Sequence, residues 1–166
     1  IAGIFFSATM IPVMYYKKLL SGNPEDFAVY ANSPFDREKR LILVAKDVSS
    51  RYTRRNKAEF GKVADYIMML AQSHVGNYMV FFPSYRYMEV VEQILDERYD
   101  GSFRWQMQTK RMTEEEREEF LALFEEKREQ SFVGLCVLGG IFSEGIDLKA
   151  ERLEGTIIVG TGLPMV

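Results

Sequence analysis

The sequence contains few of the residues that metal and disulfide sites require. Among its 166 residues there is one cysteine, Cys136, and one histidine, His74. A single cysteine excludes an intrachain disulfide, a cysteine-rich zinc site and a cysteine-ligated iron–sulfur cluster within this chain. We therefore expect no metal ligands here, and one free thiol is typical of a reducing compartment such as the cytoplasm.

The sequence also lacks an excess of positive charge and any long apolar run. It has 21 Lys and Arg against 24 Asp and Glu, for a net charge of −3. This balance excludes a uniformly basic nucleic-acid-binding protein, although it permits a local basic patch. No apolar stretch approaches the roughly 18 residues of a membrane span, and no basic residues precede the first apolar run. We expect neither a membrane segment nor a signal peptide.

What the sequence does contain is an alternation of short apolar runs and amphipathic segments. The apolar runs predict strands over residues 3–8, 27–31, 41–45, 78–82, 103–108, 132–138 and 156–159, with the second and third in a hairpin-like excursion. Helical spacing and a capping box predict helices over residues 13–20, 60–71, 90–95 and 113–124. Strands that alternate with helices predict an α/β fold, with a mostly parallel sheet covered on both faces.

Ligands of open α/β sheets bind beyond the carboxyl ends of the strands. Small, hydroxyl and acidic residues follow three of the predicted strands, at residues 7–9, 83–85 and 139–147. In the third segment Gly139, Gly140 and Gly145 allow the backbone to approach a ligand closely. Such a segment could hold a phosphate, or a ribose hydroxyl through Asp147. The alternative is a glycine-rich turn with solvated acidic residues.

Four sequence blocks, in order along the chain, carry a resemblance to a known family. They are residues 6–12 (FSATMIP), 33–35 (SPF), 80–85 (VFFPSY) and 139–148 (GGIFSEGIDL), and residues 158–164 fit as well. Together they resemble the DinG/XPD family of superfamily 2 ATP-dependent DNA helicases, in its second, C-terminal motor domain. The resemblance implies a RecA-like three-layer domain that translocates on single-stranded DNA and unwinds duplex with ATP hydrolysis.

The resemblance also implies roles for individual residues. Ser7, Ala8 and Thr9 would form motif III, which couples ATP hydrolysis to strand movement. Phe82, Pro83, Ser84 and Tyr85 would form motif IV, and the motif V residues would be Gly139, Gly140, Ser143, Glu144, Gly145 and Asp147. By this analogy Ser143, Glu144 and Gly145 contact the DNA backbone or the nucleotide interface, and Asp147 the ATP side. The implied cofactors of the full-length enzyme are ATP and Mg²⁺, neither held tightly by this chain alone. The implied partners are single-stranded DNA and a first motor domain, in the bacterial cytoplasm or nucleoid.

The chain departs from a complete helicase in two respects. No G-x-x-x-x-G-K-[ST] phosphate loop occurs, since Gly61-Lys62 is followed by Val63, and Asp96-Glu97 follows a helical stripe rather than a strand. The family's motif VI, with its arginine fingers, should follow the last strand, where the chain ends. We therefore expect residues 1–12 to hold the motif III strand and entry segment. Residues 13–166 should be the second RecA-like domain, truncated before motif VI and without ATPase activity alone.

A basic segment, residues 46–62, contains Arg51, Arg54 and Arg55 with Tyr52 between them. It could bind the phosphates of single-stranded DNA, or it could be a loop of solvated charges. The alternative to a helicase is a non-catalytic α/β module that binds a nucleotide or a partner protein. A hydrolase that uses Ser84 or Ser143 is disfavoured, because neither serine lies in a G-x-S-x-G elbow and only one histidine is present.

Overall fold

The computed structural model of the protein describes residues 3–7, 10–125 and 127–161. The chain divides into two compact units, Ile1–Val44 and Ala45–Val166. No helix within the described residues is long and apolar enough to cross a bilayer.

The N-terminal unit contains the helix α1 (Val13–Leu20) and a short 3₁₀ turn, η1 (Arg37–Lys39). The helix ends as predicted at the Ser-Gly-Asn-Pro sequence. The N–H groups of Ser21 and Gly22 both donate to the carbonyl of Lys17, at 3.0 Å each. Gly22 has φ +72°, the left-handed conformation that favours glycine at the end of a helix.

The strands predicted over residues 3–8, 27–31 and 41–45 are not formed in the described part of the chain, and residue 8 lies outside it. The prediction was wrong for a physical reason: a strand exists only when a neighbouring strand accepts its ladder of hydrogen bonds. Among the described residues these segments have no such neighbour, and their apolar side chains are exposed, as in Val29 (94%) and Leu41 (80%). An apolar run alone shows that a segment is able to pair and does not identify a partner strand.

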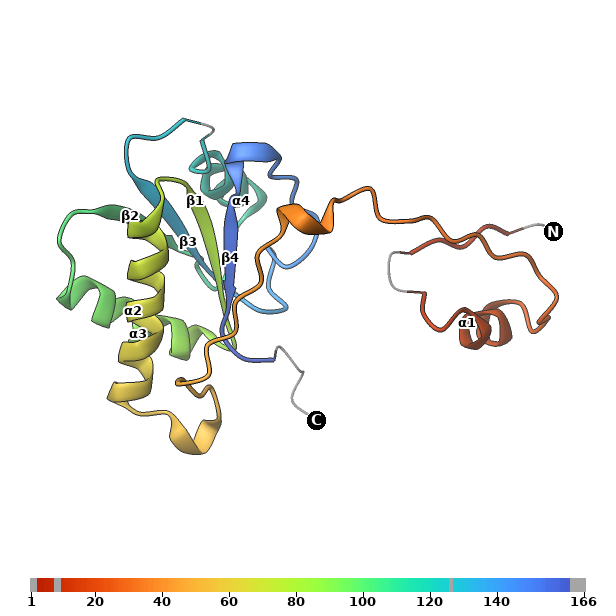
Figure 1. Ribbon diagram of the computed structural model, residues 1–166, viewed down its shortest axis with the longest axis horizontal. Helices are drawn as coiled ribbons and strands as arrows, with labels where there is room; N and C mark the ends of the chain where they lie inside the picture. The colour runs from red at the N-terminus through yellow and green to blue at the C-terminus, as the bar shows by residue number, and fades with distance from the viewer. Residues whose placement is uncertain (1–2, 8–9, 126, 162–166) are drawn as a thin grey trace. The chain divides into compact units, whose positions relative to one another are not determined.

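The C-terminal unit is built on a four-stranded sheet with the order β2-β3-β1-β4 (Figure 1). Its strands are β1 (Asn77–Phe82), β2 (Phe103–Met107), β3 (Ser131–Val137) and β4 (Gly155–Ile158). All three pairings are parallel, and β1 and β3 run in register from Asn77↔Phe132 to Phe82↔Val137. The four strands predicted for this part of the sequence are thus confirmed.

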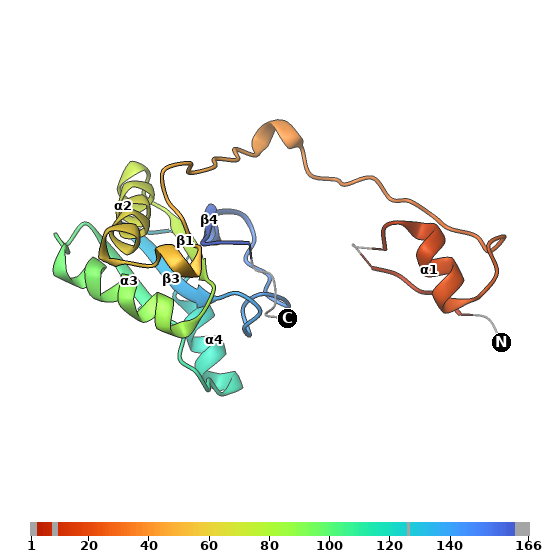
Figure 2. The same ribbon diagram turned by 90° about the horizontal axis from the view of Figure 1, so that it is seen from below.

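Helices cover both faces of this sheet. The helices α2 (Lys57–Ser73) and α3 (Tyr85–Glu97) lie on one face, and α4 (Glu114–Ala122) lies on the other (Figures 1 and 2). The alternation of side chains along β1 matches the two layers: Val80 packs with the α2–α3 cluster, whereas Met79 packs with Phe120 and Phe124 beside α4. The predicted three-layer α/β fold is confirmed, and the sheet is entirely parallel within the described residues.

Side-chain caps begin the three helices of this unit. Asn56 Oδ1, Ser84 Oγ and Thr113 Oγ1 accept hydrogen bonds from backbone N–H groups in the first turns of α2, α3 and α4, respectively. In α4 the Glu116 carboxylate also accepts from the N–H of Thr113, which completes the capping box that the sequence predicted. These caps define where α2 and α3 begin, and so where the polar segments before them lie.

Candidate functional site

The polar segments singled out in the sequence of the C-terminal unit gather at one edge of the sheet. Because all strands are parallel, β1, β3 and β4 end at the same edge, where Ser84, residues 139–147 and Gly160 follow them. The basic segment reaches this edge too, since a Cβ added to Gly160 would lie 3.2 Å from Ser50 Oγ. This carboxyl edge is where α/β sheets of this kind bind ligands.

The residues after β1 are held by the fold rather than left free. Phe82 is fully buried in the core, and the hydroxyl of Ser84 caps α3 by accepting from the N–H of Tyr87 at 3.3 Å. The hydroxyl of Tyr85 donates to the carbonyl of Thr109 at 3.3 Å and accepts from Gln108 Nε2 at 2.9 Å. Pro83, like Ser84 and Tyr85, is half-buried. Hydrogen bonds therefore fix the side chains of Ser84 and Tyr85 at the carboxyl edge.

The segment after β3, here called the 139–147 loop, turns tightly. Gly139 and Gly145 both have φ +70°, which a side chain would disfavour. The N–H of Gly140 donates to the carbonyl of Val137, and the N–H of Ser143 to the carbonyl of Gly140, at 3.0 Å each. At these two positions the backbone therefore adopts a conformation that glycine allows and other residues disfavour.

A buried phenylalanine packs this loop against α4. Phe142 is 1% exposed, and its ring stacks on that of Phe120 with centroids 4.5 Å apart. Arg117, also on α4, donates from Nη2 to the carbonyl of Gly145 at 2.9 Å. With Phe142 buried, the neighbouring Ser143 and Glu144 are exposed. The contacts of Phe142 and Gly145 with α4 thus fix the loop backbone, while Ser143 and Glu144 remain exposed to solvent.

Asp147 lies near the end of the same loop with its carboxylate accessible. Its Oδ2 is 2.9 Å from Lys149 Nζ, and the two side chains are 73% and 82% exposed. An ion pair as exposed as this contributes at most about 1 kcal/mol to stability. The carboxylate can therefore exchange Lys149 for a ligand group with little penalty.

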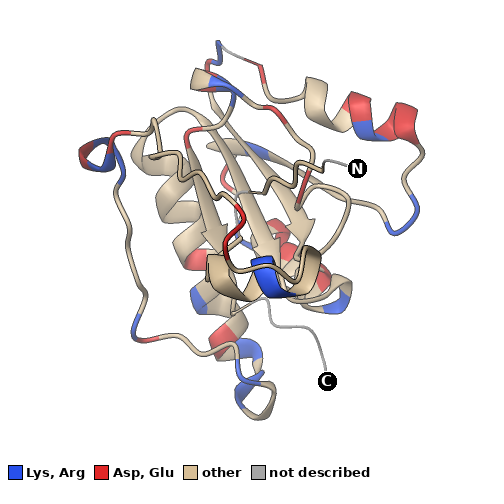
Figure 3. Ribbon diagram, turned by 90° about the vertical axis from the view of Figure 1, so that its right-hand side faces the viewer, with Lys and Arg blue, Asp and Glu red and all other residues tan. Residues whose placement is uncertain are grey.

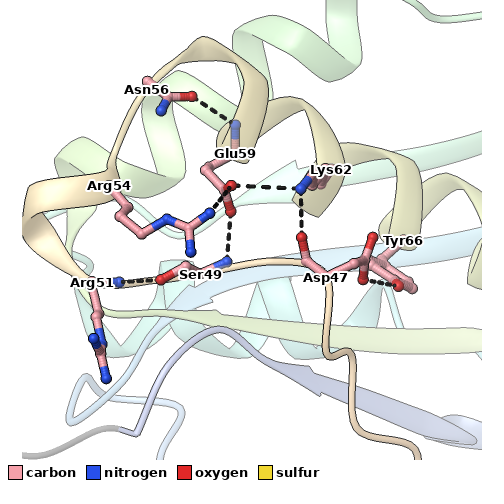
Figure 4. Close-up of polar contacts among 8 residues, drawn as sticks. All are labelled: Asp47, Ser49, Arg51, Arg54, Asn56, Glu59, Lys62 and Tyr66. Atoms are coloured by element: carbon pink, nitrogen blue, oxygen red, sulfur yellow. Dashed lines mark hydrogen bonds and ion pairs between the residues drawn. The ribbon is translucent and has the colours of Figure 1, made fainter.

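A buried carboxylate organises the basic segment (Figure 4). Glu59, on the first turn of α2, is 5% exposed and accepts from the N–H of Ser49 at 2.6 Å and from Arg54 Nη2 at 3.2 Å. Lys62 Nζ lies 3.5 Å from the same carboxylate. The Ser49 hydrogen bond is the largest cause that lowers the pKa of Glu59 below its ordinary value of 4.5, and Lys62 and Arg54 lower that pKa further.

Asp47 forms a second set of contacts with α2, beside those of Glu59, as Figure 4 also shows. Its carboxylate accepts from the hydroxyl of Tyr66 at 2.6 Å, and its carbonyl accepts from Lys62 Nζ at 2.5 Å. The Tyr66 hydrogen bond lowers the pKa of Asp47 and raises that of Tyr66, because it stabilises the carboxylate and the protonated phenol together. The basic segment is thereby fixed along α2.

The three predicted arginines have different surroundings. Arg54 is paired with Glu59, and half-buried Arg55 lies between the rings of Tyr52 and Tyr87, 5.4 and 5.2 Å from their centroids. Arg51 is exposed, and its guanidinium forms no ion pair within the described residues. Of the three, Arg51 has the side chain most available to an external phosphate.

The remaining predicted residues lie in the N-terminal unit. Ser7 is exposed there, and Ala8 and Thr9 lie outside the described residues. The role predicted for these three residues stays a prediction from sequence. No group of three or more His, Cys, Asp and Glu residues that could hold a metal ion occurs among the residues described.

Two residues that touch the site were missed by the sequence analysis, Gln108 and Arg117. Gln108 contacts both Tyr85 and Val137, and Arg117 holds Gly145. Both act through contacts between residues at least 23 positions apart, which leave no local sequence signal. The only hint is that Gln108 is a polar residue at the end of an alternating strand pattern.

The acidic start of α4 lies beside the carboxyl edge, because Arg117 of the same helix contacts Gly145 in the 139–147 loop. Its first turn carries Glu114, Glu115 and Glu116, and the acidic residues of this helix are coloured red in Figure 3. A cavity of about 310 Å³ lies near the opposite, amino edge, between His74, Asn77, Arg128 and Glu154 among others. The candidate site is therefore an open surface rather than this cavity.

The chain is similar in sequence to one protein family and in fold to two solved structures. The family described as the helicase C-terminal domain matches residues 67–166. A solved structure titled as apo XPD is similar in fold, with 23% identity over 72% of this chain and a TM-score of 0.55. A second, titled as an XPD helicase, has 25% identity over 69% of the chain and a TM-score of 0.51. The chain covers 23% and 19% of the lengths of these two proteins.

Proposed function

The chain belongs to the helicase C-terminal domain family, as a DinG/XPD-type domain of superfamily 2, and from this premise we propose that it is the second motor domain of an enzyme that uses ATP hydrolysis to move along single-stranded DNA and unwind duplex. The observation that carries this proposal is the convergence at one sheet edge of the 83–85 segment, the 139–147 loop and the basic segment.

The exposed groups of the 139–147 loop fit a nucleotide at that edge. Bound ATP with Mg²⁺ would supply the free energy of phosphoanhydride hydrolysis. Gly139 and Gly145 hold the backbone in positive-φ turns that allow close approach. The exposed Ser143 hydroxyl donates a long, 3.4 Å hydrogen bond to the carbonyl of Val137 and would exchange it for one to a phosphate oxygen. A carboxylate repels phosphate but accepts from a ribose hydroxyl or from water, so Asp147 suits that part of the nucleotide.

Arg51 fits the sugar–phosphate backbone of DNA. Its exposed guanidinium offers parallel donors for phosphate oxygens, whereas Arg54 is already neutralised by Glu59. The net charge of −3 does not oppose this role, because contact with a phosphate requires only a local cation such as the exposed Arg51. DNA would be contacted by the loops at the carboxyl edge.

In this proposal the domain works with a first motor domain that provides the phosphate loop absent from these 166 residues. Residues 1–12, with Ser7, Ala8 and Thr9, would couple hydrolysis to strand movement, and residues 13–166 would form the second lobe. The chain alone would hold ATP and Mg²⁺ weakly and would not turn ATP over. Its place of action would be the cytoplasm.

The test is DNA-stimulated ATP hydrolysis by the full-length protein that carries this domain. We expect single-stranded DNA to stimulate turnover, and Asp147→Ala to reduce kcat by about 100-fold, as loss of a positioned active-site group commonly does. Lys149→Ala is the matched control: it removes the ion-pair partner of Asp147 and should leave turnover near wild type.

Wild-type protein without DNA-stimulated turnover would contradict the proposal. If such a protein still bound a nucleotide or another protein, the domain would be a non-catalytic α/β module. Unchanged turnover in Asp147→Ala would remove Asp147 from the site while leaving the helicase assignment in place.

A further inference from the structure

Gln108 is a buried polar residue that joins three elements at the carboxyl edge. It follows β2, and its backbone N–H donates to the carbonyl of Leu135 on β3 at 2.8 Å. The residue is 3% exposed, so its side-chain amide must find partners within the protein.

Both ends of that amide are used. Oε1 accepts from the N–H of Val137, the last residue of β3, at 3.1 Å. Nε2 donates to the hydroxyl of Tyr85, the first residue of α3, at 2.9 Å, and that hydroxyl donates onward to the carbonyl of Thr109. The direction of this chain defines the amide orientation, because the N–H of Val137 requires an oxygen opposite it.

The 139–147 loop closes directly over the same amide. A Cβ added to Gly140 would lie 3.0 Å from Gln108 Nε2 and 2.9 Å from the carbonyl of Val137. The loop backbone therefore rests against Gln108 with no room for a side chain between them. The contact places Gln108 between the loop and Tyr85.

We propose that Gln108 is a positioning residue that couples the 83–85 segment to the 139–147 loop through one amide, so that the two segments keep a single relative arrangement. The proposal rests on the proposed function for its effect on turnover, and on the hydrogen-bond geometry alone for its effect on the loop. Asn lacks one methylene of reach, and Leu offers no acceptor to the N–H of Val137. A Glu carboxylate has no N–H to donate to Tyr85, whose hydroxyl would have to donate to it instead of to Thr109.

The experiment compares Gln108→Leu with Gln106→Leu in the full-length protein. Gln106 lies on β2, two positions before Gln108, and is exposed. We expect Gln108→Leu to lower kcat for DNA-stimulated hydrolysis at least about tenfold at a temperature where the protein is folded, since small displacements of reacting groups are costly. Gln106→Leu should stay within about twofold of wild type.

Tyr85→Phe separates coupling from simple destabilisation. This variant removes the hydroxyl but leaves Val137 paired, and it also serves if Gln108→Leu fails to fold. Coupling predicts that Tyr85→Phe lowers kcat as well, and that the double variant is no worse than Gln108→Leu alone. Independent, additive losses, or losses fully accounted for by a smaller folded fraction, would overturn the proposal.

Hydrogen exchange gives a reading that does not depend on helicase activity. In Gln108→Leu the amides of Val137 and Gly140 should exchange at least about tenfold faster than in wild type, while amides in the middle of β1 should be unaffected. If the wild-type protein shows no DNA-stimulated turnover, the proposed function fails and the exchange experiment still decides the coupling. Unchanged exchange at Val137 and Gly140 would overturn the coupling itself.

Discussion

The backbone N–H of Ser49 donates a 2.6 Å hydrogen bond to the buried carboxylate of Glu59. This contact joins a loop residue to the first turn of α2, where a negative charge also interacts favourably with the helix N-terminus. The same carboxylate pairs with Arg54 and neutralises it, whereas the exposed Arg51 forms no ion pair among the described residues. One acidic residue thus determines both the path and the effective charge of the basic segment.

The Glu59 contact predicts a dependence of stability on acid. Its pKa is lower in the folded protein than its ordinary value of 4.5, so folding is favoured by the carboxylate above that pH. That stability is lost as the pH falls through the lower, folded-state pKa, because protonation weakens the charge-assisted hydrogen bond from Ser49 and removes the attraction to Lys62 and Arg54. We expect Glu59→Gln to lower the urea midpoint at pH 7 and to flatten its fall below pH 4.5.

The matched control is Glu97→Gln. Glu97 is 62% exposed at the end of α3, where it pairs with Lys57. Its replacement should shift the urea midpoint little at any pH. Equal midpoint losses in the two variants at pH 7 would contradict the importance given to the buried carboxylate.

Arg51 is predicted to contribute to DNA affinity through its charge. Arg51→Ala should weaken binding of single-stranded oligonucleotides and reduce the slope of log affinity against log salt by about 0.7, the value for one phosphate contact on a single strand. Lys127→Ala removes an exposed cation near the opposite edge of the sheet and should leave that slope unchanged. The measurement is fluorescence anisotropy across a salt series, and equal slopes for wild type and Arg51→Ala would remove Arg51 from the interface.

The structure shows which features of this fold are predictable from the sequence. The cap of α4 was predicted correctly because Thr113 and Glu116 lie three positions apart, so the motif is local. The strands β1 and β3 were predicted because they are continuous apolar runs, buried on both faces of the sheet, and β2 because its buried and exposed residues alternate. The runs at residues 27–31 and 41–45 look similar in sequence but have no neighbouring strand in the part of the chain that the structure describes, and pairing is not a local property.

The same limit applies to the site. The 83–85 segment and the 139–147 loop were found because each follows a predicted strand, and ligands of α/β folds bind at the carboxyl ends of the strands. That rule requires only the order of the elements along the chain. The difference between Arg51 and Arg54 depends on a buried Glu59, and burial of a charged residue contradicts its usual preference. Gln108 depends on contacts 23 and 29 positions away.

Gly134 is predicted to be intolerant of even a methyl group. It lies on β3 beneath α4, where an added Cβ would be 2.7 Å from Phe124 Cζ and 3.1 Å from Phe120 Cζ. We expect Gly134→Ala to reduce the free energy of unfolding by about 1–3 kcal/mol through overpacking. Denaturant unfolding tests this, and Gly134→Ala combined with Phe124→Leu should recover part of the loss by making room. A neutral Gly134→Ala variant would show that the α4 layer is looser than these distances imply.

Cys136 is predicted to be unreactive in the native protein. It is fully buried near the carboxyl end of β3, and burial raises the pKa of its thiol from 9.0 to about 12. Because the thiolate is the reactive form, a thiol reagent at pH 8 should label it only through opening of the sheet. The labelling rate should therefore rise with urea as unfolding does, and it should rise in Gly134→Ala, whose strand is less stable. Rapid labelling of the wild-type protein without denaturant, followed by mass spectrometry with Cys136→Ala as the blank, would contradict the burial of β3.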